Sequence, residues 1–456
     1  MASIRLKEVT MDLSKMFKSD DGKNYVFTFA LVSTLFLLWG VCNGMIDVMD
    51  KHFQDQLHLT KAQSAWVQFA HYLGYLLMAM PASWMARKLG YKGGIISGLL
   101  LVALGGFWFV PATYISSFWA FLLGVCVIAM GLTILETVAN PYTTVLGPKR
   151  FAAARINFAQ SFNGVGWIFG PIIGGVFFYS AGGSEVAQGQ LYIPYLAVAV
   201  IVLLMSIVFY FANVPDLNTE DEYHLSDSTA TNVKRSIWSH PHFVGAVGAQ
   251  FLYVAAQAGI FSFFINYIVE EMPSISLGLS SSWFFKDRAL PREGAYYVNE
   301  QGATFLLGTI GFPLFLIGRA TGAAILRKLK AHRVLGSYAI ANVLLCFIVI
   351  LRLGWVSVAA MFLSFFFMSI MFPTIFALGI HGLGVQAKRA SGFIVMAIIG
   401  GAIMPKLMGY LGDVYNMSFS FLVPLGCFAL IAMYGYSWPK LSKADSQASF
   451  PGVQGH

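Results

Sequence analysis

Two acidic residues of this sequence, Asp47 and Glu136, stand inside apolar stretches, where an ionisable group is costly. A charged side chain in the middle of a membrane costs on the order of 3 kcal/mol or more. Burial therefore favours the protonated form of a carboxyl group until water or a partner reaches it. Such a group can take up and release a proton, although it can also be a structural acid bonded to a neighbouring helix. We place the other acids in tails, loops or helix ends, with Asp50 and Asp413 at helix ends.

Amide and aromatic side chains recur near these acids at the spacing that shares one face of a helix. Sugar hydroxyls need donors and acceptors together, which amides and carboxylates supply, and an aromatic ring packs against the CH face of a sugar. Asn and Gln also join helices in membranes, so each stripe alone can be structural. Four stripes together predict a sugar site. They are Trp39, Asn43 and Asp47; Glu136 and Asn140; Asn157, Gln160 and Asn163; and Gln250, Tyr253, Gln257 and Phe261.

Composition identifies the solvent that surrounds most of the chain. Hydrophobic residues make up 57% and charged residues 11%, and the mean hydropathy is +0.68, whereas soluble proteins carry about 25% charged residues. Apolar runs of about 18 or more residues predict spanning helices, and no barrel-type alternation is present. We predict an all-α membrane protein with twelve transmembrane helices, centred near residues 36, 74, 103, 129, 168, 202, 254, 313, 343, 367, 402 and 428.

The predicted helices divide into two sets of six. The halves echo one another, since "RKLGYKGG" at 87–94 resembles "RKLKAHRV" at 327–334. Such duplication is typical of transporters built from two repeats. Lys and Arg gather in loops that are cytoplasmic if both termini are inside. We predict a cytoplasmic tail at 1–24, a six-helix bundle at 25–214, a cytoplasmic linker at 215–239, a second bundle at 240–438 and a cytoplasmic tail at 439–456.

Several classes of protein are not expected. The start of the chain is charged and polar, which argues against a cleavable signal peptide. The four cysteines lie in predicted spans without a CxxC pair, so neither a disulfide nor a metal site is expected. Basic cytoplasmic loops account for the net charge of +8, so no nucleic-acid partner is expected. HExxH, GxSxG and GxxxxGK[ST] motifs do not occur, so we expect no enzyme, no ATP-driven pump and no cofactor, with the proton as coupling ion.

Six longer motifs together span nearly the whole predicted membrane portion: "FLLWGVCNGMID", "GLTILETVANPYTTVLGP", "RINFAQSFNGVG", "AQFLYVAAQ", "SIMFPTIFALGIHGLG" and "GFIVMAIIGG". They resemble the fucose:proton symporter family of the major facilitator superfamily. The basic loop at 87–94 lacks the acidic residue of the superfamily's commonest loop motif. The resemblance implies the twelve-helix major facilitator fold, a monomer, and a multi-pass protein of a bacterial inner (plasma) membrane.

The resemblance also implies roles for individual residues. Asp47 and Glu136 would be the essential acids, with Glu136 in both proton transfer and sugar contact. The residues that would line the sugar site by this match are Trp39, Gln160, Asn163 and Gln257. The implied function is proton-coupled import of a neutral monosaccharide.

Departures from the fucose-transporting members concern the substrate. Gly44 and Ile46 stand where those proteins have Asn, Phe372 stands where they have Tyr, and Phe261 stands where they have Trp. Sites built to bond a hydroxyl reject analogues that lack it, so fewer polar groups indicate a changed sugar. Glucose, galactose and N-acetylated hexosamines are all compatible with a roomier, less polar wall, and fucose is less favoured.

Three ionisable residues in predicted helices have more than one interpretation. Arg319 is either a charge partner for an acid or an arginine that snorkels to the cytoplasm, and we favour a gating or structural role. Lys406 more plausibly snorkels outward than couples transport. His71 can titrate near neutrality, but a neutral histidine that joins two helices is favoured.

The outer loop at 270–300 and the rival functions stay open. Trp283, Phe284 and Phe285 in this loop either lie in the membrane interface or form a lid over the entrance. A sugar facilitator without proton coupling would share every feature above. A drug/proton antiporter of the same fold would export, and its pocket would be more aromatic and carry fewer amides.

Overall fold

The computed structural model describes residues 16–18, 22–115, 117–148, 152–179, 192–215, 236–292, 294–326, 329–383 and 387–449. Each predicted helix centre lies within a helix. Among the described residues, eleven helices are long and apolar enough to cross a membrane. The stretch around residue 74 is helical but is not one of the eleven, so the count of twelve spans stays a prediction. The predicted linker lies largely outside the described residues.

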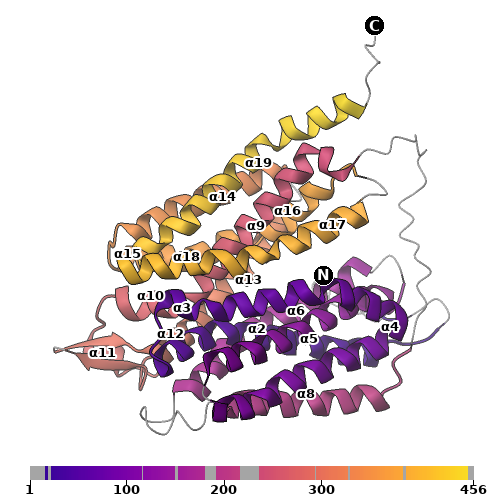
Figure 1. Ribbon diagram of the computed structural model, residues 1–456. Coiled ribbons are helices and arrows are strands. Elements are labelled where there is room, and N and C mark those ends of the chain that lie inside the picture. The colour runs from indigo at the N-terminus through magenta and orange to yellow at the C-terminus, as the bar shows by residue number, and fades with distance from the viewer. Residues whose placement is uncertain are drawn as a thin grey trace, which may run out of the picture. The chain divides into compact units, whose positions relative to one another are not determined.

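Contacts divide the chain into two units. Unit 1 is Met1–Ile46 with Leu73–Glu220, and unit 2 is Asp47–Tyr72 with Asp221–His456. The helices of the first half are α2 (Val26–Gln56), α3 (Lys61–Ser64), α4 (Trp66–Ile115), α5 (Phe118–Val145), α6 (Ala152–Tyr179) and α8 (Ile193–Phe211). Helices α5, α6 and α8 lie in unit 1 and run alongside one another in Figure 1. Helix α3 lies in unit 2, and α2 and α4 contribute to both units.

Helix α4 contains two of the predicted spans. At Gly90 the backbone takes φ 70° and ψ −176°, so two helices meet there at a kink. A positive φ of this kind suits glycine, which has no Cβ to clash with the backbone. The two predicted helices centred near residues 74 and 103 are therefore separate helical stretches joined by one residue.

Glycines let α2 and α6 approach closely within unit 1. A Cβ on Gly166 would lie 2.7 Å from the Cα of Gly40, and one on Gly44 would lie 3.1 Å from the carbonyl oxygen of Trp167. Small residues at such positions allow helix backbones to pack against each other in membranes. The sequence comparison treated Gly44 as a change in the sugar site, and the structure adds that Gly44 also lies in this helix contact.

Arg155 connects three segments at one end of unit 1 by hydrogen bonds. Its side chain is fully buried, and its guanidinium donates to the carbonyl oxygens of Thr143 at 2.9 Å, Met16 at 3.0 Å and Pro148 at 3.0 Å. A buried charge needs such partners because its desolvation is costly. Arg155 thereby joins the start of α6 to the end of α5 and to the segment before α2.

The second half is also built of helices. These are α9 (Pro241–Ser262), α10 (Phe264–Glu271), α11 (Leu277–Ser280), α12 (Glu300–Leu306), α13 (Phe312–Leu326), α14 (Ala331–Ile350), α15 (Trp355–Met368), α16 (Met371–Ile380), α17 (Ala387–Met396), α18 (Gly400–Val414) and α19 (Leu422–Ser449). A π-helical turn, Leu307–Gly311, joins α12 to α13. Short 3-10 turns occur at Ile237–Ser239, Ala397–Ile399 and Phe419–Phe421. Helix α19 extends into the predicted carboxyl-terminal tail.

The loop between α10 and α12 folds into a structure that the sequence analysis did not predict. Strands β1 (Ala289–Arg292) and β2 (Ala295–Val298) pair antiparallel beside α11, as Figure 1 shows. Gly294 turns the hairpin with φ 82°. Phe285 is buried, whereas Trp283 is 81% exposed. The all-helical expectation therefore misses one small sheet.

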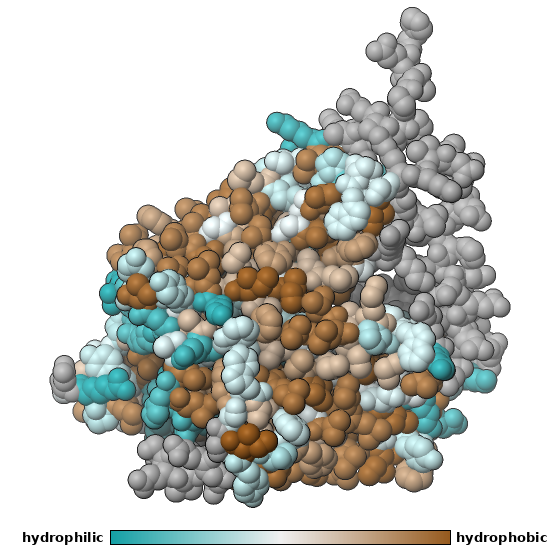
Figure 2. All heavy atoms as spheres, in the orientation of Figure 1, coloured by the Kyte–Doolittle hydropathy of each residue, from teal (hydrophilic) through white to brown (hydrophobic). Residues whose placement is uncertain are grey.

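The surfaces of both units are apolar where spanning helices lie outermost. Figure 2 shows brown, hydrophobic side chains over most of the visible helical surface. Such exposure of large apolar side chains fits a lipid solvent, since soluble proteins rarely expose large contiguous apolar patches. Examples are Leu100, Leu104, Ile201, Leu204, Leu344, Phe347 and Met433.

Candidate functional site

Amides of α5 and α6 form a linked pair in unit 1. Asn140 Nδ2 donates to the backbone oxygen of Glu136 at 3.0 Å, and Asn140 Oδ1 accepts a hydrogen bond from Gln160 Nε2 at 2.9 Å. The first bond fixes the orientation of the Asn140 amide, and the second fixes that of Gln160. Both side chains are only partly buried, so the pair presents oriented polar groups at an accessible surface.

Glu136 lies one helical turn before Asn140 on α5. Its side chain is partly buried, and its neighbours Leu135 and Val138 are buried apolar residues. Among the described residues, neither a hydrogen bond nor an ion pair engages its carboxylate oxygens. An acid in this setting is available both to a proton and to a sugar hydroxyl, because no protein group competes for it.

The first helix contributes an aromatic residue and an amide to unit 1. Trp39 Nε1 donates to the hydroxyl of Tyr75 at 2.8 Å, which fixes the indole. The Oδ1 atom of Asn43 is buried without a hydrogen-bond partner. Asn163 on α6 is buried and donates from Nδ2 to the backbone oxygen of Phe36 at 3.3 Å. Asn163 is thus partly used in joining α6 to α2. The side chain of Asn157 lies outside the described residues.

Asp47 lies in unit 2, where helix α4 supplies its hydrogen-bond partner, Gln68. The side chain is 4% exposed, and Gln68 Nε2 of α4 donates to Asp47 Oδ1 at 3.0 Å. The other carboxylate oxygen, Oδ2, is buried without a partner. Gln68 was not among the predicted site residues. Its polar side chain on the same face as His71 was the available signal.

The position of Asp50 differs from the expectation of the sequence analysis, which placed this residue at a helix end. Helix α2 continues to Gln56, and Asp50 is 1% exposed. The hydroxyl of Ser262 on α9 donates to Asp50 Oδ2, while Oδ1 is buried without a partner. The charged residues that follow Asp50 suggested an end at water. They were misleading because the packing of α9 against this turn is invisible in the local sequence.

The stripe on α9 contains polar groups without partners. Gln250 is fully buried, and among the described residues neither its amide oxygen nor its amide nitrogen has a hydrogen-bond partner. The hydroxyl of Tyr253 is also buried and has no partner in the described part of the chain. Gln257 is partly buried. Buried polar groups without partners are costly, and a polar ligand or water would satisfy them.

Two phenylalanines lie at different depths in unit 2. Phe261 is buried and stacks on Phe365 with ring centroids 4.9 Å apart, and its edge contacts include Phe312 at 5.2 Å. Phe372 on α16 is partly buried, and its ring lies edge-on to that of Tyr253 with the ring centroids 6.2 Å apart. Phe261 is therefore part of an aromatic cluster, while Phe372 retains accessible ring surface. Whether either residue contacts sugar stays a prediction.

The three residues with open interpretations all lie in unit 2. Arg319 Nε reaches the backbone oxygen of Ser369 at 3.5 Å, and its guanidinium lies 5.3 Å from the ring centre of Phe315. No salt bridge to Arg319 occurs among the described residues. Lys406 Nζ lies 4.0 Å from the ring centre of Trp66, a cation–π contact. His71 is buried, and its ring meets that of Tyr72 edge-on at 5.2 Å.

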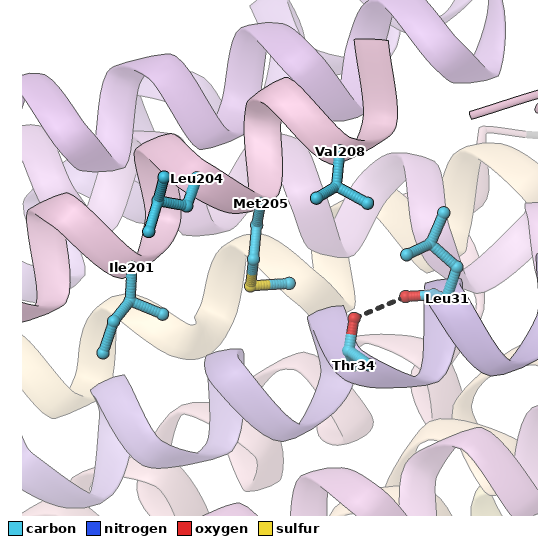
Figure 3. Close-up of a pocket in the computed structure, with 6 residues that line it drawn as sticks. All are labelled: Leu31, Thr34, Ile201, Leu204, Met205 and Val208. Atoms are coloured by element: carbon cyan, nitrogen blue, oxygen red, sulfur yellow. Dashed lines mark hydrogen bonds between the residues drawn. The ribbon is translucent and has the colours of Figure 1, made fainter. Parts of the chain in front are cut away.

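A separate cavity of about 380 Å³ lies between α2 and α8 in unit 1. Figure 3 shows Leu31 and Thr34 of α2 opposite four apolar side chains of α8, and the Thr34 hydroxyl donates to the Leu31 carbonyl at 2.6 Å. Because its one polar side chain is bonded to its own helix, this cavity suits an acyl chain rather than a sugar. The α8 residues are Ile201, Leu204, Met205 and Val208.

Comparison with known proteins identifies relatives along most of the chain. The model of the Major Facilitator Superfamily matches residues 25–398. The L-fucose-proton symporter of Escherichia coli (strain K12) is 36% identical over 435 residues, which cover 90% of this chain and 93% of that protein. A glucose/galactose transporter of Brucella abortus (strain 2308) is 33% identical over 417 residues, which cover 91% and 94% respectively.

Solved structures of other proteins share the fold of this chain. A crystal structure of the E. coli fucose:proton symporter has a TM-score of 0.62 at 33% identity, covering 91% of this chain and 99% of that one. A bacterial homolog of the human lysosomal transporter Spinster has a TM-score of 0.67 at 13% identity, covering 92% and 98%, which shows a common fold alone. The chain therefore belongs to the major facilitator superfamily, a superfamily of transporters rather than enzymes, as a relative of its fucose:proton symporters.

Proposed function

We propose that this protein is a proton-coupled symporter that imports a neutral monosaccharide by alternating access. The observation that carries the proposal is the Glu136 carboxyl group, which has no partner among the described residues and stands one turn from the linked amides Asn140 and Gln160. A proton acceptor and oriented hydrogen-bonding groups thus share one helix face. Relatives named as an L-fucose-proton symporter and as glucose/galactose transporters support it.

The proposed cycle uses Glu136 as the coupling acid. Glu136 takes a proton from outside, sugar binds beside it, and the bundles change their access from outside to inside. Once sugar has left, water reaches Glu136 and the proton passes to the cytoplasm. Asp47 is the second coupling acid, and its bond to Gln68 links α2 to α4. The proposed sugar-binding residues are Trp39, Asn43, Glu136, Asn140, Gln160, Asn163, Gln257, Phe261 and Phe372.

The proposed topology has twelve spans with both termini in the cytoplasm, in a monomer within the plasma membrane. Under this topology the loop after α2 and the hairpin β1–β2 lie outside. The bundles are those predicted at 25–214 and 240–438. The surplus of Lys and Arg in the loops assigned to the cytoplasm supports this orientation.

The proposed substrate is a hexose, with glucose, galactose or an N-acetylated hexosamine favoured over fucose. Phe261 and Phe372 bring rings without hydroxyl or amine groups to α9 and α16. A wall of this kind offers no hydrogen bond that would select for a particular hydroxyl. Relatives of this chain are named as an L-fucose-proton symporter and as a glucose/galactose transporter, and these names support a six-carbon monosaccharide as the substrate.

The test is uptake of a panel of radiolabelled sugars into proteoliposomes with an imposed inward proton gradient. Accumulation of one sugar above equilibrium, abolished by a protonophore, is expected and names the substrate. Equilibration independent of the gradient would instead identify a facilitator. A protein that moves none of the sugars but exchanges protons for a drug would be an antiporter, and either result would overturn the proposal.

A further inference from the structure

The segment 47–72 packs against α9, α10 and α18 through specific bonds within unit 2. The backbone N–H groups of Lys61 and Ala62 donate to Asp413 Oδ1 and Oδ2, both at 2.9 Å. Asn266 Nδ2 of α10 donates to Gln54 Oε1 at 2.6 Å. A Cβ on Gly409 of α18 would lie 2.7 Å from the backbone of Lys61, so the backbones of these two segments touch directly. We call this set of interactions the 47–72 contact.

Asp50 lies inside the 47–72 contact. It is 1% exposed, and its partner Ser262 belongs to α9, on the other side of the contact. Its second oxygen is buried and accepts no geometric hydrogen bond from the described residues, and Ser64 of α3 is a further polar neighbour of the carboxyl group. Asp47 stands three residues earlier on the same helix, also buried and with one unpartnered oxygen. Two buried carboxyl groups one turn apart resist being charged together.

The three lysines of the 47–72 contact and of α18 have other partners. Lys51 pairs with Asp55 at 2.5 Å, Lys61 pairs with Glu270 at 3.0 Å, and Lys406 lies on the ring of Trp66. Among the described residues no salt bridge reaches Asp50. Besides Asp50, the titratable and charged groups of segment 47–72 are Asp47, Lys51, His52, Asp55, His58, Lys61, His71 and Tyr72. Those of the helices packed against it are His242 and Tyr253 of α9; Tyr267, Glu270 and Glu271 of α10; and Lys406, Tyr410 and Asp413 of α18.

We propose that Asp50 is a third proton-binding carboxyl group, which takes its proton from outside and must hold it for the 47–72 contact to close. Closing the contact around an unpaired carboxylate carries a large desolvation penalty, whereas burying a neutral carboxylic acid bonded to Ser262 carries a much smaller one. When the contact opens, water outside reaches Asp50 and the proton returns to the side from which it came. Asp50 therefore controls closure without adding to the protons carried per sugar.

This inference rests on the proposed function, because alternating access is what requires the contact to open and close. It assigns Asp50 a task different from that of Glu136. Glu136 binds a proton that crosses the membrane with sugar, and Asp50 binds a proton that stays on the outer side. Low external pH then favours the closed contact even in the absence of sugar.

The experiment measures opening directly, without sugar. In a background with the four native cysteines replaced by alanine, Ala65, which is 1% exposed, is changed to Cys and labelled with a membrane-impermeant maleimide in right-side-out vesicles. Rates are normalised to denatured protein at the same pH. One-proton linkage changes an equilibrium at most tenfold per pH unit, so labelling is expected to rise about tenfold or more from external pH 6 to pH 8.

The variants Asp50→Asn and Asp55→Asn then separate the roles. Asp50→Asn imitates the protonated acid, so it is expected to label slowly at both pH values, with less than about a twofold change. Asp55→Asn, which breaks only the Lys51 pair on the same helix, is expected to keep the full dependence. An unchanged dependence in Asp50→Asn would overturn the proposal. Rapid labelling of Asp50→Asn at both pH values would also overturn it, since Asp50 would then be needed as a charged acceptor.

The labelling result does not depend on the proposed function being right. If the protein labels as expected but takes up none of the sugars, the symport proposal fails and the Asp50 proposal stands as a property of the contact. If it takes up sugar with protons but labelling is independent of Asp50, only the inference about Asp50 fails.

Discussion

Gln160 of α6 donates a 2.9 Å hydrogen bond to the side-chain oxygen of Asn140 on α5, one turn beyond Glu136. Asn140 in turn donates a hydrogen bond from its amide nitrogen to the backbone carbonyl of Glu136. This relay leaves Gln160 Oε1 and the Glu136 carboxyl group for a ligand. It also explains why residues 20 positions apart in the sequence act together.

The relay predicts that Gln160→Ala weakens sugar binding more than it weakens the fold. Loss of one net hydrogen bond, about 0.5 to 1.5 kcal/mol, is expected to raise the apparent KM for sugar about threefold to tenfold. Uptake kinetics at fixed pH measure this. Thr34→Ala, in the apolar cavity between α2 and α8, is the control and is expected to leave KM unchanged. An unaltered KM in Gln160→Ala would remove this residue from the sugar site.

The contact between α2 and α6 predicts that Gly166→Ala destabilises unit 1. The added methyl group would lie 2.7 Å from both the Cα of Gly40 and the backbone nitrogen of Val41, and such overpacking typically costs about 1 to 3 kcal/mol. Thermal unfolding in detergent is expected to occur at a lower temperature. The matched control is Gly248→Ala on α9, where a Cβ meets nothing within 4 Å; it is expected to be neutral or slightly stabilising. Equal melting temperatures for the two variants would contradict the packing described.

The two backbone bonds to Asp413 predict that Asp413→Ala opens the 47–72 contact more than Lys61→Met does. The first variant removes the acceptor for two N–H groups, an effect comparable to losing a helix cap, about 0.5 to 2 kcal/mol. The second keeps those N–H groups. It removes a partly exposed ion pair with Glu270, which is worth about 0 to 1 kcal/mol, and a longer 3.2 Å bond from Lys61 Nζ to the Gly412 carbonyl.

Maleimide labelling at Ala65→Cys measures this difference as well. Several-fold faster labelling is expected for Asp413→Ala, and a smaller change for Lys61→Met. If Lys61→Met labelled as fast as Asp413→Ala, the side-chain ion pair rather than the backbone bonds would hold the contact.

Sequence reasoning predicts well what depends on local pattern. The apolar runs give the helices because each run is long enough to span lipid. The i, i+4 spacing of Glu136 and Asn140 predicted a shared helix face, and both residues do lie on helix α5, where residues four apart are neighbours. The family followed from motifs spread along the chain, and the match to residues 25–398 confirms it.

What sequence reasoning missed depends on contacts between distant segments. Asp50 looked like a helix end because Lys51 and Asp55 follow it, yet Ser262, 212 residues away, completes its burial. Asp413 was correctly placed near a helix end, but its bonds to Lys61 and Ala62 join segments about 350 residues apart in the sequence, and no local signal reveals them. The hairpin β1–β2 was missed because residues 270–300 were interpreted only as an outer loop, without secondary structure of its own.

The most direct test of proton-coupled symport is the pH of a lightly buffered suspension of vesicles when the sugar identified by the uptake panel is added. The account predicts an immediate external alkalinisation as protons enter with sugar. In Glu136→Gln it predicts no alkalinisation, while exchange of labelled for unlabelled sugar continues, because exchange requires no net release of a proton. Sugar uptake without alkalinisation in the unaltered protein, or undiminished alkalinisation in Glu136→Gln, would contradict the account.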